Sequence, residues 1–277
     1  MSGEPNDLLR ELGAARQRYE SLGWPKPDLL LVSGSGLAVD LGRPTHGPLP
    51  LADLLPFPVH RVAGHPHQVE LLEPRPGKRV LYCRGRLHTY QGYDPHQAVL
   101  PVRLAAQLGA RTLLQTNAAG SLRPHLPPGR LVAVRDHLNL MGMNPLRGEL
   151  PEDWGPRFPI MTGAYDADLR GLAAERAAAL GVELDEGIYA GIAGPTYETP
   201  AEAEMLRNLG ADLTGMSTVL EVIAARHMGL RCLVLSLVTN FVAAAAADHD
   251  EVLETGKNAA GDVARLLAAL LAEPGLY

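Results

Sequence analysis

Two helix starts with the same capping pattern follow each other closely in this chain. Thr199 stands three residues before Glu202, with Pro200 between them, and Thr218 stands three residues before Glu221. In such a capping box the hydroxyl and the carboxylate each accept a hydrogen bond from a backbone N–H near the helix start, and proline fits the first helical position. The spacing therefore predicts helices that begin at residues 200 and 219.

The residues around these two helices indicate a binding pocket. Gly210 is expected to end the first helix, and the second is expected to run to about His227. Ser217 lies just before the second helix, where exposed N–H groups favour an anion. Glu198 lies just before the first helix, and there it is either a solvated loop acid or a carboxylate that faces a cleft.

Three apolar runs with the length of buried strands end in small or polar residues. Leu29–Val32 leads into Gly34-Ser35-Gly36, Thr112–Thr116 into a predicted turn at Asn117-Ala118-Ala119-Gly120, and Leu230–Thr239 into Asn240. Backbone N–H groups in a glycine-rich turn can hold a phosphate, although glycines also end many strands that bind nothing. The third glycine of a dinucleotide fingerprint is missing, and no Walker A sequence occurs.

The segment Tyr82–Tyr90 carries polar side chains at a spacing of two residues. If it is extended, Arg86, His88 and Tyr90 lie on one side of a strand. Arginine offers a planar fork that matches phosphate oxygens, and histidine can donate near neutral pH. The segment is therefore either an ordinary edge strand with mixed polar residues or one wall of an anion site.

Eight short motifs, taken in order over about residues 29–260, resemble those of the trimeric purine nucleoside phosphorylases. They are Gly34-Ser35-Gly36-Leu37, Gly85-Arg86-Leu87-His88, Thr116-Asn117-Ala118-Ala119-Gly120, Arg135-Asp136-His137, Asn144-Pro145-Leu146-Arg147-Gly148, Ala193-Gly194-Pro195 with Tyr197-Glu198-Thr199, Gly215-Met216-Ser217-Thr218 and Thr239-Asn240. Each motif alone is weak, but chance does not explain eight of them in the same order along most of the chain.

The alternation of apolar strands and helices itself predicts a three-layer α/β domain. The resemblance adds that residues 1–277 form a single domain with a mixed, partly closed central sheet flanked by helices. It implies reversible phosphorolysis of purine nucleosides (inosine, guanosine and their deoxy forms) to free base and ribose 1-phosphate. Inorganic phosphate would be a co-substrate, no cofactor or metal would be needed, and the active form would be a homotrimer.

The resemblance also implies residue roles. The matched phosphate ligands are Ser35, His65, Arg86, His88, the Ala118 backbone and Ser217. The matched purine contacts are Ala119, Tyr197, Glu198 and Asn240, and the matched ribose contacts are Tyr90, Met216, His249 and, from a neighbouring subunit, Phe158. Glu198, Asn240 and His88 would be the catalytic residues.

The chain departs from the family pattern at three places. Gln91 stands where a glutamate is common, Ser121 replaces a second glycine, and His65-Pro66-His67 replaces a more glycine-rich loop. These differences concern the phosphate side of the site rather than the class of reaction.

Two alternatives compete with the interpretation as a purine nucleoside phosphorylase. A methylthioadenosine phosphorylase of the same fold is expected to have an aspartate at position 240 and no glutamate at position 198, whereas this chain has Asn240 and Glu198. A nucleoside-binding protein without turnover would not need the set of Arg86, His88 and Ser217.

Composition excludes several other classes of protein. The net charge of −6 argues against nucleic acid as a partner. Cys83 and Cys232 lie in apolar strands and indicate no disulfide framework, and His65 and His67 have no carboxylate or cysteine at metal-ligand spacing. The charged N-terminus does not resemble a signal peptide, and the uncharged run over 232–247 is too short to span a bilayer, so we expect a cytoplasmic protein that binds no membrane.

Further helices are expected over 7–22, with Leu8, Leu12 and Leu22 on the buried face, over 100–108, and over 250–272. Residues 140–160 are expected to form a long functional loop. Gly215–Val219 resembles a nucleophile elbow without its closing glycine. Asp136 and His137 are expected to order a strand end through buried hydrogen bonds rather than to act as catalytic acid and base.

Overall fold

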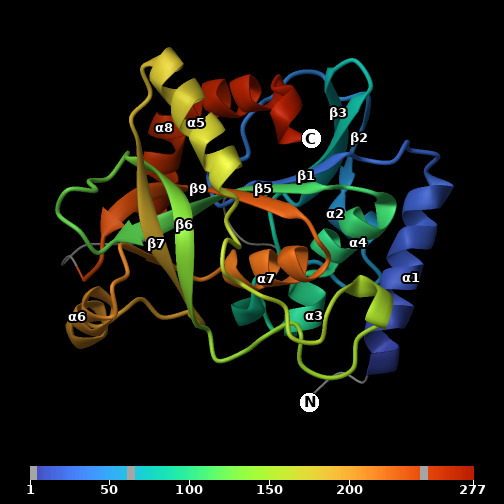
Figure 1. Cartoon of the computed structure of the whole chain (residues 1–277), viewed down its shortest axis with the longest axis horizontal. Helices are drawn as coiled ribbons and strands as arrows, with labels where there is room; N and C mark the ends of the chain where they lie inside the picture. The colour runs from blue at the N-terminus through green and yellow to red at the C-terminus, as the bar shows by residue number, and fades with distance from the viewer. Residues whose placement is uncertain (1–4, 61–65, 244–248) are drawn as a thin grey trace.

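The computed structural model describes residues 5–60, 66–243 and 249–277 (Figure 1). In these residues the strands form one nine-stranded sheet in the order β2-β3-β4-β1-β5-β8-β7-β6-β9. The strands are β1 (Leu29–Val32), β2 (His46–Pro50), β3 (Gln68–Arg75), β4 (Lys78–Arg84), β5 (Thr112–Ser121), β6 (Leu131–Leu140), β7 (Leu184–Ile192), β8 (Leu213–Gly215) and β9 (Arg231–Phe241). The helices are α1 (Pro5–Ser21), α2 (Leu51–Leu54), α3 (Pro95–Ala98), α4 (Leu100–Leu108), α5 (Ala167–Leu180), α6 (Pro200–Asn208), α7 (Val219–His227) and α8 (His249–Leu271), with short 3₁₀ turns η1 (Thr89–Gln91), η2 (Glu152–Trp154) and η3 (Pro274–Leu276).

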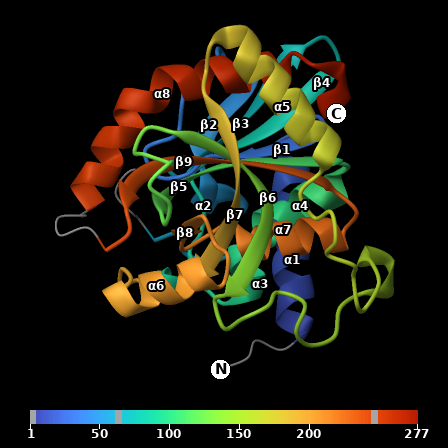
Figure 2. The same ribbon diagram turned by 60° about the vertical axis from the view of Figure 1, so that its left-hand side comes forward.

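One half of the sheet closes on itself. Strand β9 pairs antiparallel with β6 and also pairs in parallel with β5 along almost its whole length, from Thr112 opposite Arg231 to Ser121 opposite Phe241. The pairings β5–β8, β7–β8 and β6–β7 complete the ring, and Figure 2 shows β6 and β7 crossing in front of β5 and β9. The expected mixed, partly closed sheet is confirmed.

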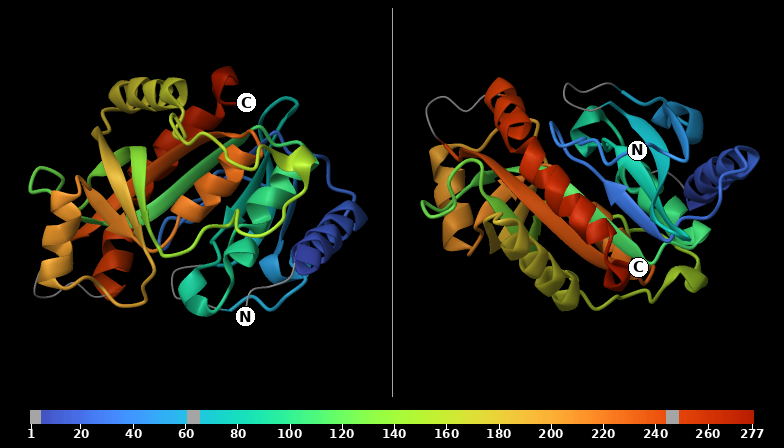
Figure 3. Two further views of the ribbon diagram at one scale, coloured as in Figure 1. Left: turned by 60° about the horizontal axis from the view of Figure 1, so that its bottom comes forward. Right: turned by 90° about the horizontal axis from the view of Figure 1, so that it is seen from above.

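Helices cover the sheet on two sides and give the expected three layers. On one side α4 contacts both α1 and α7, and residues such as Leu104 and Val222 form the larger core there. On the other side α5 and α8 pack together, with Leu169 and Leu266 in a second core. Figure 3 shows α5 and α8 on one side of the sheet, and α1 and α4 on the other.

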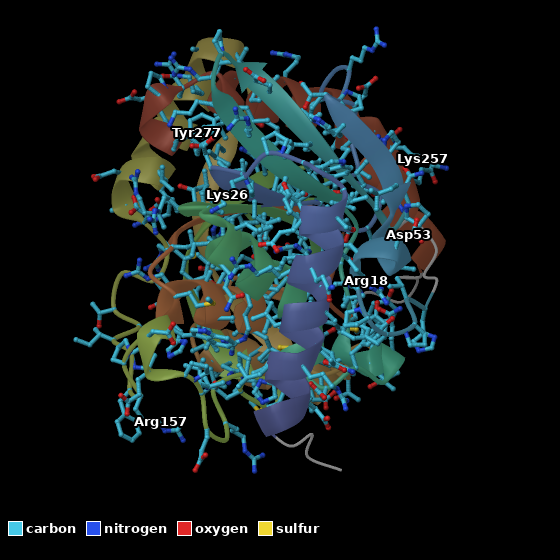
Figure 4. The ribbon with its side chains drawn as sticks, turned by 90° about the vertical axis from the view of Figure 1, so that its right-hand side faces the viewer. Arg18, Lys26, Asp53, Arg157, Lys257 and Tyr277 are labelled. Atoms are coloured by element: carbon cyan, nitrogen blue, oxygen red, sulfur yellow. The ribbon has the colours of Figure 1, made fainter. Side chains whose placement is uncertain are left out.

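The predicted helices are present, but one residue predicted to lie on a buried helix face is exposed. The helices α6 and α7 begin where their capping signals predict, and α4 spans the expected residues 100–108. Helix α8 buries Val263, Leu266 and Leu270. Leu22 was expected on the buried face of α1, but it follows the last residue of that helix and is 40% exposed. Tyr19 is buried instead, and Figure 4 shows α1 lying along the outside of the molecule.

Two predictions about strands are wrong in their boundaries. Asn117–Gly120 was expected to be a turn, but it continues β5 because β9 supplies a hydrogen-bonding partner along the whole segment. Tyr82–Tyr90 was expected to be one extended segment, but β4 ends at Arg84 and Thr89–Gln91 forms a 3₁₀ turn. Arg86 and His88 therefore lie on the loop between these elements rather than at alternate positions of one strand.

The segment over 140–160 is a long loop, as expected, and η2 is the short helical turn within it. Trp154 of this turn is buried, whereas Phe158 is 87% exposed. No helix within the described ranges is both long and apolar enough to cross a membrane.

Candidate active site

A cavity opens where β5, β8 and β9 meet the loops that follow β1, β4 and β7. It is lined by Ser35, Arg86, His88, Tyr90, Asn117, Ala118, Ala119, Gly120, Tyr197, Glu198, Thr214, Gly215, Met216, Ser217, Thr239 and Asn240. The loop after β1 comes close to β5, because a β-carbon on Gly34 would lie 2.7 Å from the Asn117 Cα atom. Glycine at this position therefore lets Ser35 reach the same cavity as residues of β5.

Arg86 is the principal cation of this cavity. Its side chain is 2% exposed, and its Nη1 atom donates to the Thr116 carbonyl oxygen at 2.9 Å and approaches the Ser217 Oγ atom at 3.4 Å. Its Nε atom lies 3.2 Å from Oε2 of Glu221. Within the described part of the chain neither Nε nor Nη2 has a hydrogen-bond partner, so the contact of Nε with Glu221 is an ion pair only. A buried guanidinium with an unused N–H group favours an anion.

The turn before α7 places Ser217 beside this arginine. Thr218 has φ 72° and ψ −51°, and the Val219 N–H donates to the Ser217 carbonyl oxygen at 2.7 Å, which is a γ-turn with positive φ. This conformation is strained for a β-branched residue. The Thr218 side chain accepts a hydrogen bond from Asn117 Nδ2 at 2.9 Å, so neighbouring residues hold the turn in place.

His88 lies beside Arg86 and is 6% exposed. Burial and the neighbouring Arg86 charge lower the pKa of His88 to about 3, so the imidazole is neutral at pH 7. Its ring stacks on Tyr90 with the ring centroids 4.7 Å apart. Its Nδ1 atom lies 3.3 Å from Oε1 of Gln91.

Polar groups near the end of β9 and on the loop after β7 form another part of the cavity wall. The Thr239 hydroxyl donates to Asn240 Oδ1 at 2.9 Å, and Asn240 Nδ2 lies 3.3 Å from the Phe241 carbonyl oxygen. Asn240 is 8% exposed, whereas Tyr197 is 49% exposed and Glu198 is half-buried. A carboxylate and a carboxamide in one pocket can pair with the donors and acceptors on the edge of a heterocyclic base.

The sequence profile of the phosphorylase superfamily matches residues 29–272. The chain belongs to this superfamily.

Individual phosphorylases resemble the chain over nearly its whole length. It is 41% identical over 254 residues to purine nucleoside phosphorylase 1 of Bacillus subtilis, a match that covers 90% of this chain and 92% of that protein. It is 43% identical over 275 residues to the purine nucleoside phosphorylase of Mycobacterium leprae, with 97% of each covered. A crystal structure of isoform 2 of the Schistosoma mansoni enzyme, in complex with cytosine and ribose-1-phosphate, matches with a TM-score of 0.87 and 32% identity, and covers 97% of this chain and 98% of that one.

Most of the site residues expected for a phosphorylase lie together in this cavity. They are Ser35, Arg86, His88, Tyr90, Ala118, Ala119, Tyr197, Glu198, Met216, Ser217 and Asn240. Phe158 does not line it, and lies instead beside a separate hollow that includes Arg147 and Met161. His65 falls outside the described residues, as does the side chain of His249 at the start of α8.

The structure adds cavity residues to which no role was assigned from sequence. Asn117, Thr214 and Thr239 line the cavity, and Glu221 contacts Arg86 from behind it. Asn117 and Thr239 belong to recognised motifs, so their positions could have indicated a part in the site. The capping-box spacing points to Glu221, but no local signal in the sequence indicates its long-range contact with Arg86.

Two further motifs have structural surroundings. His137 lies outside the cavity, with its Nδ1 atom 3.0 Å from the Tyr165 hydroxyl. Asp136 was expected to make buried hydrogen bonds, but it is exposed and accepts from the His137 N–H. In the described ranges no group of three or more His, Cys, Asp or Glu residues could hold a metal ion.

Proposed function

We propose that this chain catalyses the reversible phosphorolysis of 6-oxopurine nucleosides, with inosine, guanosine and their deoxy forms as substrates. The products are the free purine base and ribose 1-phosphate. The observation that carries this proposal is that one cavity holds both a buried arginine with an unused N–H group and the pair Glu198 and Asn240. The names of the relatives and the ribose-1-phosphate in the Schistosoma mansoni complex support the same reaction.

The chemistry requires charges at both ends of the substrate. A phosphate oxygen forms a bond to the anomeric carbon while the bond from that carbon to the purine nitrogen breaks, and the electron pair of the broken bond leaves with the base. Arg86, Ser217, Ser35 and the Ala118 N–H would hold the phosphate, and Asn240 would donate to the departing base. Such fixed donors lower the barrier because they need not reorganise as charge develops.

Glu198 and Asn240 would also select the base. A 6-oxopurine offers an N1–H donor that suits the Glu198 carboxylate and an O6 acceptor that suits the Asn240 amide, whereas adenosine offers the reverse at both positions. Tyr197 and Ala119 would line the base, and Tyr90 and Met216 the sugar. The methylthioadenosine phosphorylase alternative is not favoured, because the named relatives are purine nucleoside phosphorylases and position 240 is an asparagine.

The proposal includes a homotrimer in which Phe158 of one subunit covers the sugar of its neighbour. Phe158 and Ile160 are 87% and 79% exposed on the 140–160 loop, and the adjoining Arg157 lies at the edge of the molecule in Figure 4. A hollow that includes Leu140 and Met205 shares Tyr197 and Glu198 with the main cavity and could receive an apolar side chain of a second copy. A cytoplasmic location stays a prediction.

The reaction can be tested by incubating the purified protein with inosine in the presence and absence of inorganic phosphate. We expect hypoxanthine and ribose 1-phosphate to form in equal amounts, and only when phosphate is present. Methylthioadenosine serves as the competing substrate. If nucleoside binds but no base is released, the chain is a binding protein rather than an enzyme, and faster cleavage of methylthioadenosine would reassign its substrate.

A further inference from the structure

A buried carboxylate lies behind the phosphate end of the cavity without lining it. Glu221 is 6% exposed and stands on the first turn of α7. Its Oε2 atom accepts a hydrogen bond from the Thr218 N–H at 3.1 Å and lies 3.2 Å from Arg86 Nε. One oxygen atom therefore contacts both the loop after β4 and the turn before α7.

The contacts of Arg86 show what this carboxylate does to the guanidinium. The Nε edge faces Glu221, and Nη1 contacts the Thr116 carbonyl oxygen and Ser217 Oγ. Neither Nε nor Nη2 makes a hydrogen bond among the described residues, so Glu221 acts on the Nε edge as an ion-pair partner. Because a guanidinium is planar and rigid, fixing one edge also fixes the direction of the remaining N–H groups.

Glu221 has a second effect on the turn that carries Ser217. Thr218 is held in a strained γ-turn, and the hydrogen bond from its N–H to Glu221 is one of the contacts that keep it there. The Ser217 hydroxyl lies 3.1 Å from Thr218 Oγ1 and 3.4 Å from Arg86 Nη1. The direction of the serine and that of the arginine thus depend on the same carboxylate.

We propose that Glu221 is a positioning residue for phosphate: it orients Arg86 and the Ser217 turn together, so that both meet the same anion. This inference rests on the proposed phosphorolysis. A negative charge so close to an anion site would weaken binding if it had no other effect. The presence of Glu221 is explained if the gain from orienting Arg86 is larger than the repulsion between its carboxylate and phosphate. Without Glu221 the buried Arg86 charge would lack a partner, which is costly.

The test compares Glu221→Ala, Glu221→Gln and wild type by steady-state kinetics with phosphate and inosine varied separately. Loss of a hydrogen-bonded buried charge partner should raise the KM for phosphate in Glu221→Ala by roughly tenfold or more. The KM for inosine should change by less than about threefold, because Glu221 does not line the cavity. Glu221→Gln keeps an acceptor oxygen for the Thr218 N–H but removes the charge that faces Arg86. Its KM for phosphate should therefore lie between those of wild type and Glu221→Ala.

A second glutamate–arginine pair, with a buried carboxylate and a half-buried arginine, provides a control. Glu70 is 3% exposed, and its Oε2 lies 3.7 Å from Arg84 Nη1, but neither residue lines the cavity. Glu70→Ala should lower stability without a selective change in the KM for phosphate. If Glu221→Ala raises both KM values equally, or raises the KM for phosphate no more than Glu70→Ala does, the positioning role is wrong.

Calorimetric titration of each protein with inorganic phosphate separates failure of this inference from failure of the proposed function. A wild type that binds phosphate but releases no base contradicts the function alone. Normal turnover with unchanged phosphate affinity in the Glu221 variants contradicts the inference alone. If Glu221→Ala does not fold, Glu221→Asp is measured instead, and its shorter carboxylate should still raise the KM for phosphate.

Discussion

Gln91 Oε1 accepts a hydrogen bond from the His88 backbone N–H at 2.9 Å and lies 3.3 Å from Nδ1 of the same histidine. The amide orientation of Gln91 is fixed, because its Nε2 donates to the His60 carbonyl oxygen at 2.9 Å. Since Oε1 can only accept, the His88 Nδ1 atom must carry the proton. Neutral His88 is therefore the Nδ1–H tautomer, and its Nε2 atom is an acceptor.

Replacing Gln91 by glutamate should make the phosphate step depend on pH. Burial, Arg86 and His67 all lower the pKa of His88, and only the neutral Gln91 amide opposes them. A carboxylate at position 91 favours the imidazolium and raises this pKa. In Gln91→Glu the pH profile of kcat/KM for phosphate should gain an ionisation, with tighter phosphate binding on its acidic side.

The matched control for this experiment is Gln107→Glu, which adds the same charge on α4 outside the cavity. It should leave the wild-type pH profile unchanged. Identical profiles for wild type and Gln91→Glu would contradict the role given to Gln91.

Acid should destabilise the protein through histidines that are buried or half-buried. Burial is the largest cause that lowers the pKa values of His88, His96, His137 and His227, with that of His88 at about 3. Below the unfolded value of about 6.5 the unfolded chain binds more protons than the native chain, so stability falls as the pH falls. His88 alone should lower the free energy of unfolding by about 2 kcal/mol between about pH 6.5 and pH 5.

Urea unfolding at pH 7.5 and at pH 5.0 measures this loss. The difference in unfolding free energy between the two values should be smaller in His88→Asn than in wild type. An equal difference in both proteins would show that His88 does not contribute.

Arg86→Ala should reduce phosphorolysis by roughly 100-fold or more, because it removes the buried cation that faces the anion. Arg84→Ala, two residues earlier and outside the cavity, is the matched control and should retain most of the activity. Rates are measured over a range of phosphate concentrations. Normal saturation by phosphate in Arg86→Ala would refute the assignment.

Local signals in the sequence predict much of this structure. Capping chemistry places the starts of α6 and α7, because Thr199, Glu202 and Pro200 act within one helical turn. The apolar run at Leu29–Val32 predicts a buried strand, and all four of its residues are buried in β1. The motifs identify most of the cavity residues, because these residues lie at the ends of neighbouring strands or on the loops that follow them.

Structural features that depend on residues far away in the sequence could not be predicted from local patterns. The small residues of Asn117–Gly120 predict a turn, and only the pairing of this segment with β9 keeps it extended. The spacing of Thr218 and Glu221 predicts a helix cap, but only the fold places Arg86 beside Glu221. Leu22 has the correct helical spacing but lies beyond the end of α1, where it is exposed.

Phe158→Ala should raise the KM for inosine while leaving the fold intact. An aromatic contact contributes about 0.5–1.5 kcal/mol beyond its area burial, which corresponds to roughly a 2- to 12-fold change in KM. The side chain is 87% exposed within one chain, so its removal should not alter the thermal midpoint of the subunit. Light scattering gives the oligomeric state, and a fully active monomer would remove the trimer from the proposal.

Base selectivity tests the pairing of Glu198 and Asn240 with a 6-oxopurine. Adenosine would leave a buried polar group unpaired at each of its two edges, at a cost of about 1–3 kcal/mol each. Inosine and guanosine should therefore be preferred over adenosine by about two orders of magnitude or more. Asn240→Asp supplies an acceptor for a 6-amino group and should shift this ratio toward adenosine.

The measurement is kcat/KM for inosine and adenosine in wild type and in Asn240→Asp. Asn139→Asp is the matched control, because Asn139 lies on β6 outside the cavity and its Nδ2 donates to the Met143 carbonyl oxygen. It should leave the ratio unchanged. Comparable kcat/KM values for the two nucleosides in the wild type would contradict the 6-oxopurine assignment. Glu198 and Asn240 would then not form selective hydrogen bonds with the edge of the base.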